Sequence, residues 1–339
     1  MPIELFDARM LGPLLGFLQA NGIQHEPLLD RTRISAQLIR SGGWISKKQA
    51  YDFTFEVVRR SGCQESVYSA YTAFGLEQLG PVAVAMRSCK TVKDSLEVGL
   101  QLGSIAYEGN EYFLRIEEDT TWICYREPRV ISIGQPYIND MTLAVYAQLV
   151  RTLVNAEWRP ERVLLRGELD DRHRCSDQFS QCQIARHAGI TALAIPTEFL
   201  ARRLPPEIQA TEDSVDDPWR FGPEDDGPCA EKLYRLLAAN FTCRKLPTLE
   251  QIAMIVDTSE ATLKRMLSAS GTSYRRVLDR LRFDEATRML EIPELTIREA
   301  ASELGFSDAS NFARSFYRMT GMTPTQYRRD QLGVEPNVR

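Results

Sequence analysis

Long apolar runs and a disulfide framework are both absent from this chain of 339 residues. The longest mostly apolar stretch, residues 143–150, is well short of the roughly 18 residues that a membrane-spanning helix needs. The first residues also lack the basic segment and apolar core of a signal peptide. The seven cysteines are odd in number and scattered, which indicates reduced thiols. We therefore expect a cytoplasmic protein that does not enter a membrane.

Histidine is scarce, and the common signatures of catalysis are missing. The chain has three histidines and no Gly-x-Ser-x-Gly, P-loop or Gly-x-Gly-x-x-Gly sequence. These motifs position nucleophiles or the backbone amides that bind phosphate, so their absence excludes the enzyme classes that depend on them. We expect neither an enzyme nor a bound cofactor.

One group of metal-ligating residue types lies between residues 173 and 187. His173, Cys175, Cys182 and His187 are close in sequence, but they lack the tightly spaced cysteine pair of structural zinc sites. Cys182 falls in an expected strand, where packing explains it. We predict no metal site, and sensing of a metal or of thiol oxidation through these residues stays an alternative.

Acidic residues outnumber basic ones overall, but not in the last third of the chain. The formal net charge is −5, with 41 Lys and Arg against 46 Asp and Glu. Residues 231–339 hold 17 basic and 14 acidic residues, a balance of +3, which leaves 24 against 32, or −8, for residues 1–230. A mildly basic terminal segment is compatible with nucleic-acid binding.

A segment rich in proline, glycine and acidic residues divides the chain. Residues 207–226 contain eight acidic residues and one arginine, and Pro and Gly interrupt the stretch from 205 to 228. Like charges repel each other, so this composition is typical of a linker. We predict a first domain over residues 1–205, a linker over 206–230, a second domain over 231–332 and a tail over 333–339.

The first domain mixes two periodicities. Apolar residues recur at helical spacing over residues 11–21, 46–61, 92–102 and 140–155. Between 111 and 126, apolar and polar residues alternate on both sides of Asp119-Thr120, which predicts a β-hairpin. Residues 162–166 and 183–194 have the pattern of further short strands. We expect an α+β domain with at least one antiparallel sheet.

The second domain is predicted to be all helical, and its clearest motif lies in residues 296–321. Thr296 can cap a first helix, and Gly305 then permits the left-handed backbone of a tight turn. Ser307 or Asp308 caps a second helix. Ala301 lets the two helices cross closely, as in a helix-turn-helix unit, whose second helix enters the major groove of DNA. The buried stripe of this second helix is expected to comprise Phe312, Phe316 and Tyr317.

A second copy of this arrangement lies in residues 249–267. A short helix is followed by Asp257-Thr258, where Asp tolerates left-handed backbone, and Ser259 caps a helix that points Leu263, Met266 and Leu267 inward. An ordinary helical hairpin explains one such unit equally well, whereas two copies favour DNA binding. The outward faces carry Ala261, Thr262, Lys264 and Arg265 in this unit, and Ala309, Ser310, Asn311 and Arg314 in the other.

One amphipathic helix is expected between the two units, over residues 274–290. Its length of about 17 residues, at about 1.5 Å each, gives a rod of about 25 Å. A rigid rod of this length can hold two recognition helices about one turn of DNA, roughly 34 Å, apart on one face of the duplex. Two units joined in this way predict a protein that reads successive major grooves.

The stretch IREAASELGFSDASNFARSFYRMTGMTPTQYRR closes the helical domain with Gly-x-x-Pro-x-x-Tyr-Arg, at positions 321, 324, 327 and 328. On this motif, residues 231–339 resemble the DNA-binding domain of the AraC/XylS family of bacterial transcription regulators. Arg282 and Ala286 also stand at family positions in the connecting helix. Leu267 and Asp257 depart from the family's usual Phe and Gly, and both changes are compatible with the expected core and turn.

The resemblance implies a transcription regulator that binds double-stranded promoter DNA and helps to recruit RNA polymerase. It also implies base contacts from the outward faces of both recognition helices. Alanine can make only apolar contact there, whereas Lys264, Arg265 and Arg314 suit phosphates and guanine edges. The predicted DNA-binding residues are Ala261, Thr262, Lys264, Arg265, Ala309, Ser310, Asn311 and Arg314.

The segments TVKDSLEVGLQLG (residues 91–103) and FSQCQIARHAGITALAIPTEFLARRLP (residues 179–205) carry a weaker resemblance. They are similar to the non-cupin "arabinose-binding" sensor domain of regulators for ornithine use and virulence. This resemblance implies effector sensing and a homodimer, and we expect an activator that responds to a small metabolite. A constitutive dimeric regulator without a ligand is an alternative, as is a thiol- or metal-sensing regulator.

Aromatic residues gather around the expected hairpin of the first domain. Aromatic side chains line many ligand pockets, but they also build ordinary cores. We expect a core, and the sequence assigns no residue to an effector site. The residues in question are Tyr107, Tyr112, Trp122, Tyr125 and Tyr137.

Overall fold

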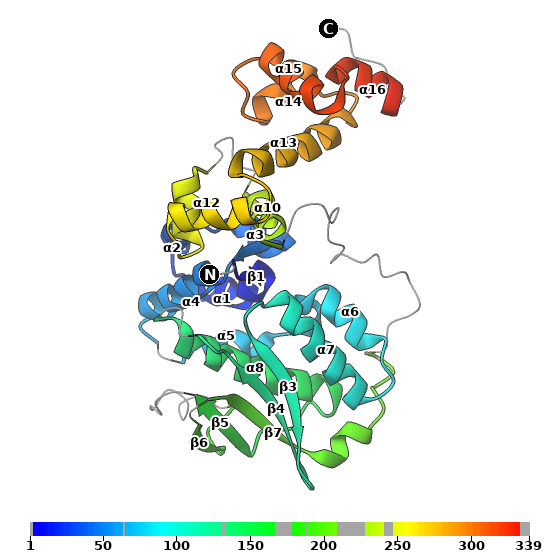
Figure 1. Ribbon diagram of the computed structural model, residues 1–339. Helices are drawn as coiled ribbons and strands as arrows, with labels where there is room; N and C mark the ends of the chain where they lie inside the picture. The colour runs from blue at the N-terminus through cyan, green and yellow to red at the C-terminus, as the bar shows by residue number, and fades with distance from the viewer. Residues whose placement is uncertain are drawn as a thin grey trace. The chain divides into compact units, whose positions relative to one another are not determined.

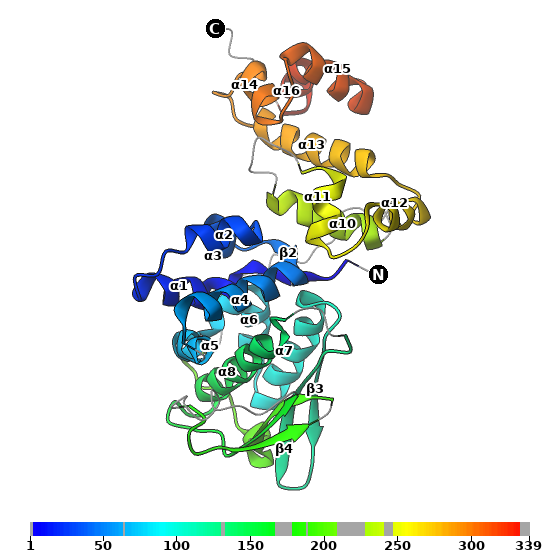
Figure 2. The same ribbon diagram turned by 90° about the vertical axis from the view of Figure 1, so that its left-hand side faces the viewer.

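The computed structural model describes residues 3–63, 65–129, 133–166, 178–187, 189–208, 228–240 and 247–332. The chain divides into two compact units, Glu4–Arg220 and Phe221–Arg339, and Figures 1 and 2 show them from two sides. Among the described helices, none combines the length and the apolar character that crossing a membrane requires.

The first unit mixes helices and strands, as predicted. Its helices are α1 (Gly12–Ala20), α2 (Glu26–Thr32), α3 (Ala36–Ser41), α4 (Lys47–Ser61), α5 (Ser66–Ala70), α6 (Pro81–Arg87), α7 (Val92–Ala106) and α8 (Gln135–Leu153). Its strands are β1 (Leu5–Asp7), β2 (Trp44–Ser46), β3 (Glu111–Ile116), β4 (Thr120–Arg126), β5 (Arg162–Arg166), β6 (Gln183–His187) and β7 (Thr191–Pro196).

Five strands form the larger sheet, in the order β3-β4-β7-β5-β6. All neighbours are antiparallel except β5 and β6. β3 and β4 make the predicted hairpin, with Phe113 opposite Cys124. α7 packs against β3, and α8 packs against β5 and β7, so two long helices cover the sheet (Figure 2).

Strand β4 is buried on both of its faces. Trp122 and Cys124 pack with Ala192 and Ala194 of the neighbouring strand β7 and with Ile190 just before it. Side chains alternate along a strand, so Ile123 and Tyr125 point to the opposite face, where both are also buried. This second face belongs to the side that α7 and α8 cover.

The helix predictions for the first unit are confirmed with shifted ends. α1 and α4 lie within the predicted ranges, and α7 extends beyond residue 102 to Ala106. α8 begins at Gln135, five residues before the predicted start at 140. Pro136 fits the first turn of α8 because it lacks only an amide proton that this turn does not need.

The second unit is helical throughout its described residues, as predicted. Its helices are α10 (Pro228–Asn240), α11 (Leu249–Ile255), α12 (Glu260–Ala269), α13 (Tyr274–Leu290), α14 (Ile297–Glu303), α15 (Ala309–Thr320) and α16 (Pro324–Leu332). We refer to α11 and α12 as the first helical pair, and to α14 and α15 as the second. Residues 209–227 of the predicted linker and the predicted tail 333–339 lie outside the described residues.

Candidate nucleic-acid interface

The first helical pair is shaped by its caps and its turn. The hydroxyl of Thr248 accepts from the N–H of Gln251 at 3.2 Å, and Gln251 Oε1 accepts from the N–H of Thr248 at 2.8 Å. This capping box satisfies amides that a helix start leaves free. Asp257 has a φ of 56°, the left-handed conformation predicted for the turn. Ser259 Oγ then caps α12 by accepting from the N–H of Thr262 at 3.1 Å.

The inner side of α12 packs into the unit. Leu263 and Leu267 are buried, together with Ile252 of α11. Met266, which was predicted to lie inside, is only half-buried. It follows Leu263 by three positions, which is 300° around a helix, so Met266 lies toward the edge of the buried stripe.

The outer side of α12 carries the predicted recognition residues. Ala261, Lys264 and Arg265 are exposed, and Lys264 Nζ lies 2.5 Å from Glu260 Oε1. An exposed ion pair of this kind is weak, so Lys264 remains able to bind a phosphate. Thr262 is half-buried and its hydroxyl accepts from Ser259 at 2.9 Å, which ties this side chain to the cap.

The second helical pair repeats the same construction. Thr296 and Glu299 form a capping box, with backbone N–H donations of 3.2 Å to Thr296 and 2.9 Å to Glu299. Gly305 takes the turn at a φ of 77°. Asp308 caps α15 by accepting from the N–H of Asn311 at 2.7 Å. Of the two caps that the sequence allowed, the structure uses Asp308.

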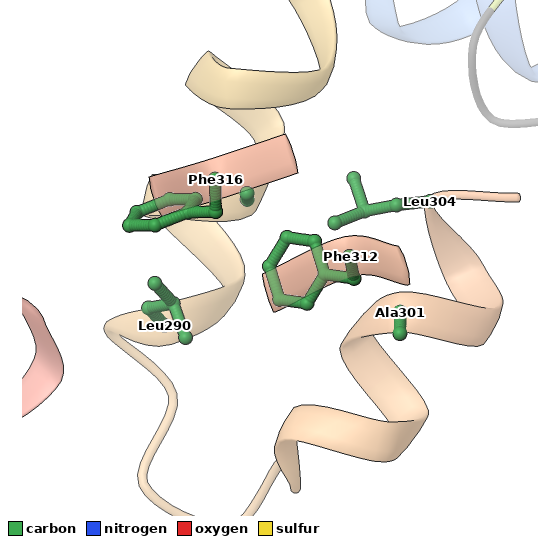
Figure 3. Packing of buried hydrophobic residues seen from close by; sticks show 6 residues of the cluster. Leu290, Ala301, Leu304, Phe312 and Phe316 are labelled. Atoms are coloured by element: carbon green, nitrogen blue, oxygen red, sulfur yellow. The ribbon is translucent and has the colours of Figure 1, made fainter. Parts of the chain in front are cut away.

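A small aromatic core holds the second pair together. Figure 3 shows Phe312 between Ala301 and Leu304 on one side and Leu290 and Phe316 on the other. The ring centroids of Phe312 and Phe316 are 5.7 Å apart. Tyr317, predicted to complete this stripe, is 56% exposed. That prediction was wrong because a residue five positions after Phe312 lies about 140° around the helix from it.

The outer side of α15 carries a chain of hydrogen bonds. Asn311 Nδ2 donates to Asp308 Oδ2 at 2.7 Å and to Ser307 Oγ at 2.6 Å. Arg314 Nη2 donates to Asn311 Oδ1 at 2.6 Å. These bonds orient the amide of Asn311 and the guanidinium of Arg314 before any ligand binds. Ser310 and Arg314 are exposed, while Asn311 is half-buried.

Asp308 gives this face a fixed negative charge beside Arg314. The N–H of Asn311 and then the hydroxyl of Ser307 lower the pKa of Asp308, so its carboxylate stays ionised at neutral pH. A carboxylate repels phosphate, which makes the Asp308 end of α15 better suited to base edges than to the DNA backbone. Ala309 is half-buried and packs against the aromatic core, so only part of it can contact a ligand.

α13 contacts α10 before it in the chain and α14 after it (Figure 1). Toward α10, Tyr234 donates to Asp284 Oδ2 at 2.6 Å and Arg280 Nη1 lies 3.2 Å from Glu231 Oε2. Arg280 also lies over the Tyr234 ring, 4.4 Å from its centroid. These contacts hold the middle of α13 against α10.

The second half of α13 belongs to the aromatic core. Ala286 and Leu290 are fully buried in it. Arg282 lies over the ring of Phe306, 5.4 Å from its centroid, and Phe306 follows Gly305 in the turn of the second pair. α13 therefore holds this turn directly as well as through the core.

Arg328 of α16 is a buried structural residue that the sequence marked only as part of a motif. It is 1% exposed, and it donates to the carbonyls of Leu290 at 3.0 Å and Leu295 at 2.8 Å, with a longer bond to Ile292. These carbonyls lie at the end of α13 and in the loop before α14. Burial lowers the pKa of Arg328.

The group of residues considered for metal or thiol sensing is not assembled by the described part of the chain. His173 and Cys175 lie outside the described residues, and no cluster of three potential metal ligands occurs among those described. Burial raises the pKa of Cys182 to about 12, which keeps its thiol protonated. His187 Nδ1 accepts from the N–H groups of Gly189 and Ile190, both at 3.0 Å.

The first unit contains a cavity of about 70 Å³ between α6, α7, α8 and β4. Tyr107 and Tyr112, two of the five aromatic residues expected to form ordinary core, line this cavity. Gly99 and Gly103 of α7 line it as well. The sequence did carry a signal for it, because two glycines one turn apart in a helix leave space on the same face.

Two family models match the chain. A model described as the arabinose-binding domain of AraC transcription regulators, N-terminal, matches residues 22–204, which is more than half of the chain. A helix-turn-helix domain model matches residues 252–330, which include the second half of α11, all of α12 and the whole second helical pair.

Characterised relatives match over shorter stretches. The ornithine utilization regulator of Pseudomonas aeruginosa is 36% identical over 140 residues, which cover 40% of this chain and 40% of that protein. The regulator VirS of Mycobacterium tuberculosis is 40% identical over 89 residues, 25% of this chain and 26% of VirS. The match thus spans less than half the length of these relatives.

The solved structure of the transcriptional regulator CdpR from Pseudomonas aeruginosa aligns over 95% of this chain and 98% of CdpR, with 20% identity and a TM-score of 0.44. The family assignment comes from the sequence models, which match both units of the structure. The chain belongs to the AraC family of transcription regulators, with an arabinose-binding-type N-terminal domain and a helix-turn-helix C-terminal domain.

Proposed function

We propose that the second unit binds double-stranded promoter DNA through both helical pairs, each acting as a helix-turn-helix unit. α12 and α15 then act as the recognition helices. The observation that carries this proposal is that both helices bury one face and expose cations on the other, with Lys264 and Arg265 on α12 and Arg314 on α15. Exposed cations on a helix that fits the major groove are suited to phosphates and guanine edges.

The proposed role of α13 is to set the distance between the two recognition helices. Its 17 residues give a rod of about 25 Å. This length suits two DNA-reading heads, the recognition helices α12 and α15, placed about one turn of DNA, roughly 34 Å, apart. The contacts of Arg280 with α10 and of Arg282 with the turn of the second pair support a rigid link. The two heads then enter successive major grooves on one face of the duplex.

We assign each exposed residue a role within this complex. Lys264, Arg265 and Arg314 bind phosphates or guanines, and Ser310 and Asn311 hydrogen-bond to base edges. Alanine makes apolar contacts such as those with a thymine methyl group. The proposed contact residues are Ala261, Thr262, Lys264, Arg265, Ala309, Ser310, Asn311 and Arg314.

We also propose that residues 1–205 sense a small metabolite and form a homodimer, and that the bound regulator activates transcription by recruiting RNA polymerase. The cavity in the first unit supports the sensing role. The matched family model is named for arabinose and one relative for ornithine, so these two compounds belong among the ligands to be compared.

DNase I footprinting with the full-length protein tests the DNA-binding proposal. On DNA upstream of its own gene and of the neighbouring genes, we expect protection of two successive major grooves on one face. Lys264→Ala with Arg265→Ala should lose one half of the footprint, and Arg314→Ala should weaken the other. Arg288→Ala, an exposed arginine on α13, is the control. Absence of any sequence-specific protection would overturn the proposal.

A further inference from the structure

The cavity of the first unit is lined by side chains that are themselves buried. Met86 of α6, Leu96 of α7, and Ile138 and Met141 of α8 line it, and each is at most 4% exposed. One ordered water needs about 10–15 Å³ of such space and two to four polar partners. A space of about 70 Å³ is therefore larger than one water needs, yet its walls offer few partners for water.

One glycine of α7 keeps part of this space open. Gly99 and Gly103 both line the cavity, one helical turn apart, but a Cβ on Gly99 would come within 2.7 Å of Met86 Sδ, so Gly99 makes room for Met86. A Cβ on Gly103 would come no nearer than 3.8 Å to the ring of Tyr112, so backbone conformation and crowding do not demand glycine there. Glycine weakens a helix interior relative to alanine. Its presence at a position where alanine fits indicates that the empty volume itself is useful.

One end of the cavity offers hydrogen bonds. Asn110 and Tyr112 both line the cavity, and Asn110 Nδ2 donates to the hydroxyl oxygen of Tyr112 at 3.2 Å. Within the described residues, no acceptor is recorded for the O–H proton of Tyr112, so this proton can be donated to a ligand. Asn110 Oδ1 accepts from Lys47 Nζ at 2.5 Å, which fixes the orientation of the amide.

The cavity wall carries no formal charge. None of its lining residues is Asp, Glu, Lys, Arg or His, and burial raises the pKa of Tyr107, Tyr112 and Tyr146, which keeps them neutral. Lys47 lies behind Asn110, but its charge is already paired with Glu127 at 2.7 Å and Glu4 at 3.4 Å. Among the described residues at the cavity, no positive or negative group is left to compensate a charged ligand.

These features exclude two classes of ligand on physical grounds. A zwitterionic amino acid or a diamine would lose its hydration without gaining a counter-charge. A sugar would bury several hydroxyl groups, of which the Asn110 and Tyr112 end can satisfy only one or two. A molecule with an apolar body and one uncharged polar end matches both the walls and this end.

We propose that the effector of this regulator is a small, uncharged, mainly apolar molecule, bound in the cavity of the first unit with its one hydroxyl or carbonyl group at Tyr112 and Asn110. This inference rests on the proposed effector-sensing role of the first unit. It differs from what the names of the matched family model and of the ornithine regulator suggest, since the site selects against sugars and charged amino acids.

The test compares ligands of equal length and different charge on the full-length protein without DNA. The probes are n-hexanol, hexanoate and hexylammonium, together with L-ornithine and L-arabinose, and binding is followed by isothermal titration and thermal shift. n-Hexanol should bind and raise the melting temperature, because a ligand that binds only the native state stabilises it. The four charged or polyhydroxylated probes should leave the melting temperature unchanged.

Three variants locate the binding site. Gly103→Leu fills the cavity and should abolish n-hexanol binding, and Gly103→Ala should weaken it. Gly16→Leu is the matched control, since Gly16 is an exposed glycine of helix α1 with no atom within 4 Å of an added Cβ. Tyr112→Phe should weaken n-hexanol by about two- to tenfold, the loss expected for one hydrogen bond. The circular dichroism of each unliganded variant shows whether it folds.

The outcomes separate this inference from the proposed function. Failure of n-hexanol to bind the wild type, equal binding to Gly103→Leu, or binding of ornithine or arabinose that Gly103→Leu abolishes would each overturn the inference. A footprint that persists in those cases leaves the DNA-binding proposal intact. Loss of the footprint with n-hexanol binding retained would overturn the DNA-binding proposal instead.

Discussion

Arg314 is held in place before DNA arrives. Its guanidinium donates to Asn311, which in turn donates to Asp308, so two side chains of the proposed contact surface share one network. Fixing a flexible side chain in advance lowers the entropic cost of binding. The network also means that changes at Asn311 and Arg314 should not be additive, because the two residues are in direct contact.

Replacing Arg314 should weaken specific binding and broaden the preferred sequence. Arg314→Ala is expected to cost about 1–3 kcal/mol of specific binding and to relax the preference at one base pair. Fluorescence anisotropy with operator variants, each substituted at one position, measures both effects. Arg288→Ala serves as the control and should change neither. Equal affinity and specificity for Arg314→Ala and wild type would refute the assigned role.

Arg328 stabilises the second unit without facing its exposed surface. Its side chain donates to the carbonyl of Leu290, which is buried, and to that of Leu295, which is partly buried, and both would lose this partner without it. Arg328→Ala should lower the free energy of unfolding by about 3 kcal/mol, because unpaired buried acceptors cost about 1–3 kcal/mol each. Lysine cannot reach several carbonyls at once with a single ammonium group, so Arg328→Lys should recover only part of the loss.

Hydrogen exchange of the full-length protein measures this effect where it occurs. Amides of α14, α15 and α16 should exchange faster in Arg328→Ala, while amides of the first unit should not change. Arg329→Ala is a matched control, since the neighbouring Arg329 is exposed and pairs with Asp330. If both variants exchanged alike, Arg328 would have no special structural role.

At the scale of whole elements, the second unit was more predictable than the first. Its turns depend on local signals, such as the left-handed Asp257 and Gly305 and the capping boxes at Thr248 and Thr296. A cap acts within four residues of its helix end, so a short stretch of sequence contains the whole interaction. Tyr317 was misplaced because its apolar ring suggested burial while its position in the helix did not.

The cavity was not predictable in the same way. It forms only where α6, α7, α8 and β4 come together, and no local pattern encodes the distance between elements far apart in sequence. The aromatic residues gave no clear signal, since Trp122 packs on the opposite face of the sheet from Tyr125. The two glycines of α7 were the better indication, because they remove side chains from one helix face.

Gly321 ends α15 in the left-handed conformation, with a φ of 74°. An added Cβ would meet no atom within 4 Å, so Gly321→Ala isolates the cost of the backbone conformation. We expect a loss of about 1 kcal/mol of stability in the second unit. Gly16→Ala, within α1, should instead stabilise the first unit by about 0.5–1 kcal/mol. Urea denaturation, followed by hydrogen exchange in each unit, measures the stability change of both variants. Stability changes of the same sign in Gly321→Ala and Gly16→Ala would contradict this account.

On the scale of the whole regulator, the two proposed functions are distributed over two units. The second unit carries the proposed DNA-binding surface, and the first contains a cavity for the proposed small molecule. A ligand can shift the regulator between states only by as much as its affinity differs between them. A buried apolar cavity is suited to such a difference, since filling it changes the packing of three helices and a strand together.

The proposed rigidity of α13 predicts how the protein responds to altered operators. If the heads are held at one fixed distance, adding five base pairs between the two half-sites turns one half-site to the opposite face and prevents simultaneous binding. Adding ten base pairs restores the face but moves the half-site about 34 Å further away. A fixed rod cannot follow, so we expect both insertions to lower affinity by roughly a hundredfold or more, the loss of several base contacts.

A flexible joint between the heads would behave differently. It would tolerate the ten-base-pair insertion and reject only the five-base-pair one, because only the face of the duplex would then matter. Gel-shift titrations of the three operators with the full-length protein, at one salt concentration, separate these cases, since affinity for DNA depends steeply on salt. The contacts of Arg280 with α10 and of Arg282 with the turn of the second pair hold α13 on two sides, so the rigid outcome is the expected one. Recovery of affinity at ten base pairs would show that α13 does not set the spacing.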